Sequence, residues 1–271
     1  MSRSISDIGG NAIVYTYPNG DFDIIAASNK VFVPAGWEES EDWSRPARRE
    51  PGGEAGAETA PAPRQKGKKS EGDDRVRSMR RARAKLRRLA LANEFRWFVT
   101  LTLDPARVDR YDPAAIMKIV NRWLDNMVRR HGLRYILVPE QHKDGAYHFH
   151  GFFAGDLEAV ASGHHDPQGH EYYNLPQWTL GYTTAVELYG TYSAAVAYCC
   201  KYIGKQEGQR PMGRWYYSGG RLAEPTKLYT TLEYNTLGVE FPEECVEFSI
   251  PGTQMVVIHH REGKNEQGNH C

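Results

Sequence analysis

The stretch LRYILVPEQHKDGAYHFHGFF, residues 133–153, contains two apolar runs on either side of a short polar segment, residues 143–145. Both runs are rich in β-branched and aromatic residues, which favours strands. The polar segment ends on a glycine, which can take the positive φ of a bulged hairpin turn. The pattern therefore predicts two antiparallel strands. If the loop has three residues, Glu140 lies opposite His148, whereas a two-residue loop turns Glu140 to the other face.

Two histidines stand two positions apart in HFHGFF, so on a strand His148 and His150 face the same side. Alone, this spacing is equally typical of polar positions on a half-buried strand. The three-residue loop adds Glu140 to the same face. Two neutral imidazoles and a carboxylate predict a divalent cation site, for Mg²⁺ or Mn²⁺ if phosphate oxygens complete the shell. His142 shares the side of Glu140 and is the alternative third ligand.

The flanking segments predict the rest of the domain around this hairpin. FRWFVTLTLD, residues 95–104, alternates apolar and polar positions as a half-buried strand does. Helical periodicity then runs from Asp112-Pro113 to His131-Gly132, and WTLGYTTAVEL predicts a further strand. We therefore expect a mixed α/β fold of the α+β type, with a central, mostly antiparallel sheet and flanking helices.

The ends of the chain have a different character. Residues 12–33 predict a strand pair that turns at Asn19-Gly20, and the segment after about 206 holds further short β-like runs. A stretch rich in Pro, Gly and charge cannot bury enough apolar surface to order itself. We expect four parts, namely N-terminal β segments (1–45), a flexible linker (46–72), a main domain (73–225), and C-terminal β segments with a polar tail (226–271).

Composition limits the class of protein. The chain has 271 residues, 40% of them hydrophobic, and equal numbers of basic and acidic side chains, 34 each, so net charge alone indicates no polyanionic partner. Four cysteines, two of them adjacent, do not suggest a disulfide framework. The first ten residues have no apolar core of an export signal, and no run is long enough for a membrane span. We expect a cytoplasmic protein that does not enter membranes.

Positive charge is nevertheless concentrated in one predicted helix, which begins near residue 73 with an apolar stripe along one side. So many cations on few turns suggest contact with DNA phosphates, although a solvated helix is the alternative. The segment RWYYSGGR, residues 214–221, interleaves arginine and aromatic residues and suits base stacking, or equally a hairpin end. The DNA-binding candidates are Arg77, Arg80, Arg81, Arg83, Lys85, Arg87, Arg88, Arg214 and Arg221.

Other histidines carry less weight. Residues 162–178, rich in His, Gly and Pro, predict a loop, and a solvated loop is favoured over a second metal cluster at His164, His165 and His170. The pair His259 and His260 has the same interpretation.

The stretch AVAYCCKYIGK, residues 195–205, places Tyr198, Lys201, Tyr202 and Lys205 on one helical face. We expect the opposite, apolar face to pack on the sheet, and the tyrosine face to look outward. A surface helix with lysine side chains extended to solvent is the alternative. Tyrosine, lysine and a metal ion are also the groups that covalent phosphodiester transfer requires.

Three motifs, in the order FVTLTLD, HFHGFF and YCCKYIGK, resemble those of the HUH endonucleases, specifically the rolling-circle replication initiators of bacteriophages and plasmids. A tyrosine motif after the histidine motif resembles initiators, whereas conjugative relaxases usually have the reverse order. Two tyrosines four residues apart are similar to the two-tyrosine initiators of single-stranded DNA phages. The resemblance extends from about residue 75 to 220.

The resemblance implies a ferredoxin-like core and site-specific nicking and rejoining of single-stranded DNA through a 5′-phosphotyrosine. Glu140, His148 and His150 would bind the ion, and the two tyrosines would be the nucleophiles, with Tyr198 preferred if only one acts. Lys201 and Lys205 would assist them. A bacterial host would supply helicase and polymerase, because the chain has no phosphate-binding loop motif. A transposase of the same chemistry and a non-catalytic DNA-binding repressor are the alternatives.

Overall fold

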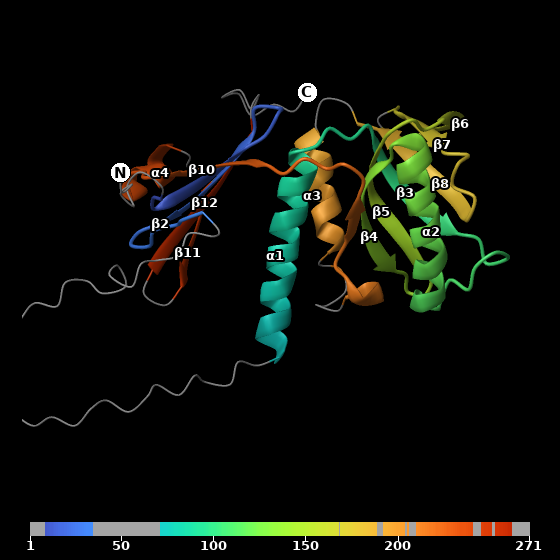
Figure 1. Cartoon of the computed structure of the whole chain (residues 1–271), viewed down its shortest axis with the longest axis horizontal. Helices are drawn as coiled ribbons and strands as arrows, with labels where there is room; N and C mark the ends of the chain where they lie inside the picture. The colour runs from blue at the N-terminus through green and yellow to red at the C-terminus, as the bar shows by residue number, and fades with distance from the viewer. Residues whose placement is uncertain are drawn as a thin grey trace, which may run out of the picture.

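The computed structural model describes residues 9–34, 71–167, 169–188, 192–203, 205, 210–240, 245–250 and 253–261. These residues form two β-sheets, in which every strand pair is antiparallel, and four α-helices. The expected mixed α/β fold is thereby confirmed. One long helix, α1 (Glu71–Leu91), stands between the two sheets (Figure 1). None of the helices in these residues is long and apolar enough to cross a membrane.

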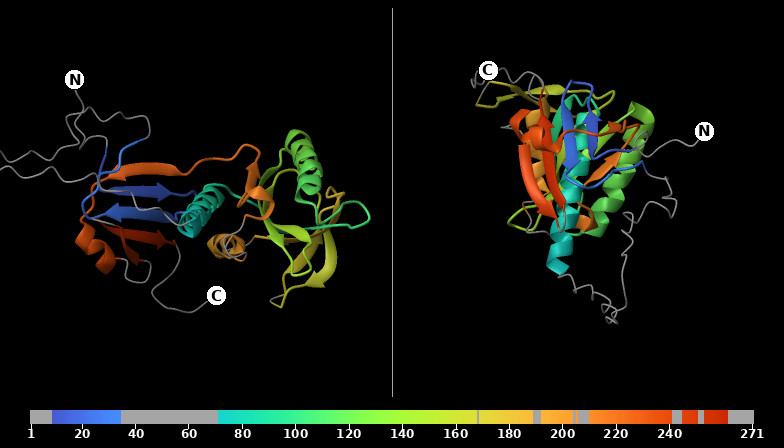
Figure 2. Two further views of the ribbon diagram at one scale, coloured as in Figure 1. Left: turned by 90° about the horizontal axis from the view of Figure 1, so that it is seen from below. Right: turned by 90° about the vertical axis from the view of Figure 1, so that its left-hand side faces the viewer.

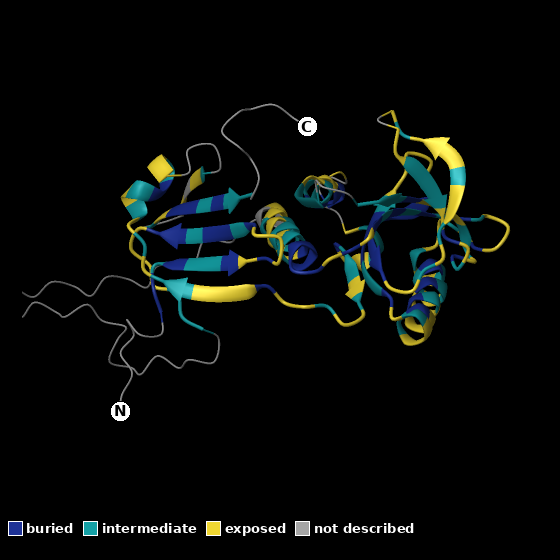
Figure 3. Ribbon diagram, turned by 90° about the horizontal axis from the view of Figure 1, so that it is seen from above, coloured by how far each residue is buried: buried dark blue, intermediate teal, exposed yellow. Residues whose placement is uncertain are grey.

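The larger sheet has seven strands and holds the hairpin of residues 133–153 near its centre. In spatial order the strands are β6 (Val160–His165), β7 (Glu171–Asn174), β8 (Gly181–Glu187), β3 (Trp97–Leu103), β5 (Tyr147–Ala154), β4 (Arg134–Gln141) and β9 (Tyr217–Gly219). The strands expected around residues 95–104 and 133–153 are confirmed as β3, β4 and β5. The loop expected over 162–178 was partly wrong, because β6 and β7 form an exposed hairpin there (Figure 3). Their strands are polar on both faces, so no apolar alternation marks them.

Helix α2 (Pro113–His131) covers one face of this sheet and has the expected bounds. The Asp112 side chain accepts hydrogen bonds from the first-turn N–H groups of Ala114 and Ala115, and Gly132 ends the helix in the left-handed conformation at φ 59°. Its apolar residues pack against alternate residues of β3, which are Val99, Leu101 and Leu103. The sheet is therefore closed by a core on the α2 side.

The opposite face of the sheet is covered by α1 and by α3 (Tyr192–Tyr202), which lie side by side in Figure 2. Ile136 of β4 and Phe152 of β5 share a core with Leu86 of α1 and Val196 of α3. Glu140 lies on this face as well, because it is an even number of positions from Ile136.

The second sheet has five strands, in the order β10 (Thr226–Thr230), β1 (Ala12–Thr16), β2 (Phe22–Ala27), β12 (Thr253–His260) and β11 (Cys245–Ile250). The expected turn at Asn19-Gly20 is confirmed, with Gly20 at φ 83°. The N-terminal and C-terminal β segments thus build one sheet together, with α4 (Tyr234–Glu240) against β12. The expected linker lies outside the described residues up to residue 70.

Candidate functional site

The β4–β5 hairpin has the three-residue loop that places its acidic residue on the histidine face. Glu140 pairs with His148 across the two strands. The N–H of His142 donates to the carbonyl oxygen of Ala146 at 2.8 Å, and Gly145 takes a φ of 89°. A side chain other than glycine would be strained at that φ.

Three side chains of this hairpin gather their ligand atoms within 4.8 Å of one another, and they are Glu140, His142 and His148. Among the described residues, the buried Nε2 of His148 has no hydrogen-bond partner. Burial, together with the nearby rings of His142 and His150, lowers the pKa of His148 to about 4. A neutral imidazole with a buried, unpaired nitrogen and an adjacent carboxylate fit a divalent cation.

His150, expected as a metal ligand, contacts the carboxylate instead. Its Nε2 lies 2.6 Å from Oε2 of Glu140, and its Nδ1 lies 3.1 Å from the hydroxyl of Thr100 on β3. Burial lowers the pKa of His150, although Glu140 opposes the shift. His142, the alternative third ligand, takes its place in the converging group. The sequence analysis missed Thr100, whose only signal is its polar position in the alternation of β3.

Lys205 also binds this carboxylate. Its ammonium lies 3.0 Å from Oε1 of Glu140 and 4.2 Å from the ring centroid of Tyr202. Burial alone would raise the pKa of Glu140, but the hydrogen bond from Lys205 and the contacts with His150 outweigh it, so that pKa is lowered. Glu140 is therefore ionised at neutral pH.

The tyrosine helix approaches the histidine strand with a different face from the expected one. The ring of Tyr202 is only 6% exposed and stacks on His150 at 3.9 Å between centroids, with 12° between the planes. The Sγ of Cys200 faces α1, 3.9 Å from the carbonyl oxygen of Arg83. The expectation that the tyrosine face looks outward is wrong for Tyr202, because α1 covers part of the apolar face and the tyrosines meet the sheet.

The two tyrosines differ in their surroundings. Tyr202 donates a hydrogen bond to the hydroxyl oxygen of Tyr198 at 2.8 Å, and Tyr198 is 49% exposed. Burial and the hydrogen bond with Tyr198 raise the pKa of Tyr202. Lys201 is exposed on the last turn, and Lys205 lies beyond the end of α3. The accessible hydroxyl is thus that of Tyr198, and Tyr202 supports it from behind.

Three of the arginines expected to bind DNA are used inside the protein. Arg83 donates to the carbonyl oxygen of Cys200 at 3.1 Å, Arg87 forms an ion pair with buried Asp23, and Arg88 lies 4.3 Å over the ring of Tyr15. The count of charges in the sequence could not separate them from cations on the solvent side. The exposed members of the expected set are Arg80, Arg81, Lys85, Arg214 and Arg221, whereas half-buried Arg77 pairs with Asp74.

The remaining histidines do not converge on a second metal site within the described residues. His165 and His170 each contact a neighbouring carboxylate, of Glu171 and Asp166 respectively. His259 contacts Asp23 at 2.8 Å, and His260 stacks on Phe22.

Fold and site together define an α+β domain in which two tyrosines of a helix face a His/Glu cluster on an antiparallel sheet. Residues 96–207 match the model of a family of replication-associated proteins, the ORF2 family. That segment holds both the β4–β5 hairpin and α3, and the match supports a replication initiator that interacts with DNA. No curated protein and no solved structure gives a significant match.

Proposed function

We propose that this chain is a rolling-circle replication initiator of the HUH type, which nicks and rejoins one DNA strand through a 5′-phosphotyrosine. One observation carries the proposal, namely that the hydroxyls of Tyr198 and Tyr202 share a hydrogen bond while the Tyr202 ring stacks on His150. This arrangement brings nucleophile candidates to the edge of a cluster that suits a divalent cation. The family match over 96–207 supports the same role.

Tyr198 is the nucleophile that we propose for the first cleavage. Its oxygen would form a bond to the scissile phosphorus, the bond from phosphorus to the 3′-oxygen would break, and that oxygen would leave as a hydroxyl that can prime synthesis. The proton lost by the phenol balances the proton gained by the 3′-oxygen. The hydrogen bond donated by Tyr202 would stabilise negative charge on the Tyr198 oxygen as its proton leaves. Tyr202 would act in the second transfer.

The ion site would use Glu140 and His148, with either His142 or His150 as the third protein ligand. The ion, Mg²⁺ or Mn²⁺, would supply Lewis-acid polarisation of the phosphate. Lys205, already on Glu140 and Tyr202, would stay near the tyrosines, and exposed Lys201 would contact the phosphate.

The wider assignments follow from this function. The nuclease domain would span 73–225, and the exposed cations Arg80, Arg81, Lys85, Arg214 and Arg221 would hold DNA phosphates. The protein would work in the cytoplasm of a bacterial host with the host's helicase and polymerase.

A covalent adduct is the decisive test of this function. The full chain is incubated with Mn²⁺ and labelled single-stranded oligonucleotides from its own replicon, beside Tyr198→Phe, Tyr202→Phe and the double variant, and resolved on denaturing gels. Tyr182→Phe is the matched control, since Tyr182 is 67% exposed on β8 and outside the cluster. We expect a metal-dependent adduct that survives at least one single change and vanishes in the double variant. Tight binding without any adduct would favour the non-catalytic repressor instead.

The third metal ligand is settled by a binding measurement. Mn²⁺ affinity is measured by electron paramagnetic resonance for His142→Ala and His150→Ala. A larger loss in His142→Ala assigns the geometric cluster. A larger loss in His150→Ala assigns the pair two positions apart on β5.

A further inference from the structure

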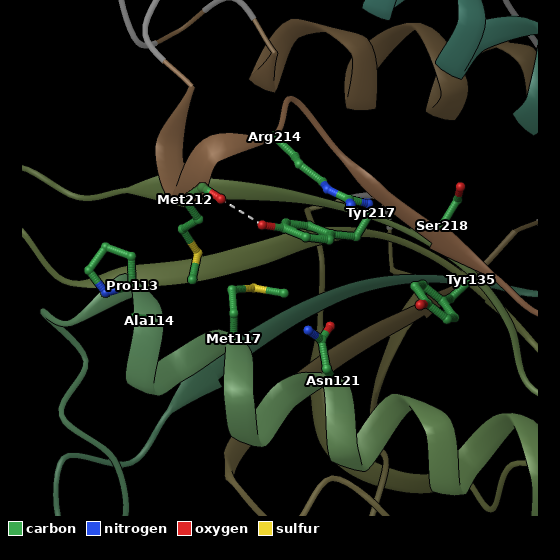
Figure 4. Close-up of a pocket in the computed structure, with 9 residues that line it drawn as sticks. All are labelled: Pro113, Ala114, Met117, Asn121, Tyr135, Met212, Arg214, Tyr217 and Ser218. Atoms are coloured by element: carbon green, nitrogen blue, oxygen red, sulfur yellow. Dashed lines mark hydrogen bonds between the residues drawn. The ribbon is translucent and has the colours of Figure 1, made fainter.

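A second pocket lies on the face of the seven-stranded sheet that is opposite Glu140. Its volume is about 510 Å³, and it opens between the first half of α2 and the sheet edge at β4 and β9 (Figure 4). The lining residues are Pro113, Ala114, Met117, Asn121, Tyr135, Met212, Arg214, Tyr217 and Ser218. The size is that of small-molecule sites in proteins.

The walls of this pocket are soft and flat. The thioethers of Met117 and Met212 enter it from α2 and from the turn η3 (Pro211–Gly213), and the ring of Tyr217 closes the side across from α2 (Figure 4). Met212 takes a φ of 58°, an uncommon conformation for a residue with a side chain. The hydroxyl of Tyr217 donates to its carbonyl oxygen at 2.7 Å and holds this turn in place. An unfavourable backbone thus fixes a polarisable side chain at the pocket.

Polar groups occupy the remainder of the lining. Asn121 points into the space from α2, and the Tyr135 ring lies at its far end (Figure 4). A Cβ on Gly219 would lie 2.6 Å from the Tyr135 ring, so only glycine on β9 lets that ring lie there. The guanidinium of Arg214 lies 5.8 Å over Tyr217, at the rim. One amide, one phenol and one cation therefore face a flat, apolar slot.

We propose that this pocket receives one extruded nucleotide of the DNA strand, an inference that rests on the proposed function. A base fits between the methionines and the Tyr217 ring, the Asn121 amide offers a donor and an acceptor to its edge, and Arg214 meets its phosphate. Tyr135 lies five residues before Glu140 on β4, roughly 17 Å along the strand. Because β9 is the edge strand, a single strand held at Glu140 can pass around that edge.

Oligonucleotide binding without metal tests this pocket separately from nicking. Single-stranded 12-mers, each with 2-aminopurine at one position, are titrated into the full chain in EDTA, for wild type, Asn121→Ala and the pocket-filling Met117→Trp. The matched control is Asn126→Ala, an exposed asparagine of the same helix outside the pocket. Free dAMP serves as a competitor that distinguishes a nucleotide in the strand from a free one.

We expect Asn121→Ala and Met117→Trp to raise the Kd at least about fivefold, with Asn126→Ala unchanged within about twofold. The 2-aminopurine signal should change at one position in wild type and be lost in Met117→Trp. Equal affinity in wild type and Asn121→Ala overturns the proposal, and so does a pocket that takes dAMP but not the strand. If Met117→Trp fails to fold, the exposed position of Asn121 keeps the test valid. Absence of a covalent adduct in the nicking assay would leave this result standing.

Discussion

Both sheets present a cluster of charged and polar side chains toward the helices between them, and the two clusters differ in how completely they are paired. On the five-stranded sheet, Asp23 is 2% exposed and receives Tyr17, Arg87 and His259, while Asp21 accepts a hydrogen bond from Ser193. On the seven-stranded sheet, the Nε2 of His148 has no partner among the described residues.

This difference separates a structural cluster from a candidate chemical one. A buried charge whose hydrogen bonds are all supplied by the protein holds two elements together and has no capacity left for a ligand. An unpaired imidazole nitrogen beside a carboxylate retains that capacity. Asp23 thus fastens the five-stranded sheet to α1, and Glu140 with His148 forms the centre that we propose for catalysis.

The largest expected effect is on the unsaturated cluster. Glu140→Ala or His148→Ala should slow formation of the covalent adduct about a thousandfold, since a catalytic ion contributes several kcal/mol to such a barrier. The rate is measured with Mn²⁺ and the cleaved oligonucleotide on denaturing gels. His165→Ala, which removes an exposed histidine of β6, is the control. Near-normal rates in both cluster variants would contradict the assignment.

Breaking the saturated cluster should cost stability and spare metal binding. Asp23→Ala leaves Arg87 buried without its carboxylate, and we expect a loss of about 3–5 kcal/mol in the free energy of unfolding. Urea titration followed by circular dichroism measures it. Asp74→Ala, which removes the exposed partner of Arg77, should cost less than about 1 kcal/mol. Equal losses in the two variants would show that the Asp23 network is not a fastening.

The same network predicts a pH dependence. Burial would raise the pKa of Asp23, but the hydrogen bond from His259 and the charge of Arg87 outweigh it, so the pKa in the folded protein lies below its ordinary value of 3.8. The stabilisation is therefore full above that value and is lost as the pH falls through the folded pKa. The gap in unfolding free energy between wild type and Asp23→Asn should be constant from about pH 5 to 7 and shrink below 3.8. A gap that is unchanged at low pH would refute this origin.

The smallest effect concerns the lysine on Glu140. Lys205 is half-exposed, and its charge opposes a cation at the same carboxylate. Lys205→Met should therefore bind Mn²⁺ about twofold to fivefold more tightly. The titration is followed by electron paramagnetic resonance, with Lys201→Met as the control from the same segment. Weaker binding in Lys205→Met would mean that the lysine supports the site rather than competes for it.

Local patterns in the sequence were sufficient for the elements whose signals lie within a few residues. The bounds of α2 follow from the cap at Asp112 and the glycine at 132, and the pairing of Glu140 with His148 follows from a three-residue loop ending at Gly145. Each depends on backbone preferences of neighbouring residues. The core of the site was therefore predictable.

Features that depend on distant contacts were not predictable from the sequence. The tyrosine face of α3 could be identified from helical spacing, but only the position of α1 decides that Tyr202 turns to His150. The same applies to Arg87, whose partner lies on β2, and to the pairing of β2 with β12. No local periodicity encodes these neighbours.

The pairing of β2 with β12 has a consequence for the time at which the parts of the chain can fold. Asp23 and His259 are 236 residues apart in sequence. At a synthesis rate of about 5–20 residues per second, β2 would leave the ribosome roughly 10–50 seconds before its neighbour exists. The seven-stranded sheet and α1 can form during that interval. The face of α1 that carries Arg87 would wait exposed, and a chaperone that recognises it would bind only while the chain is being made.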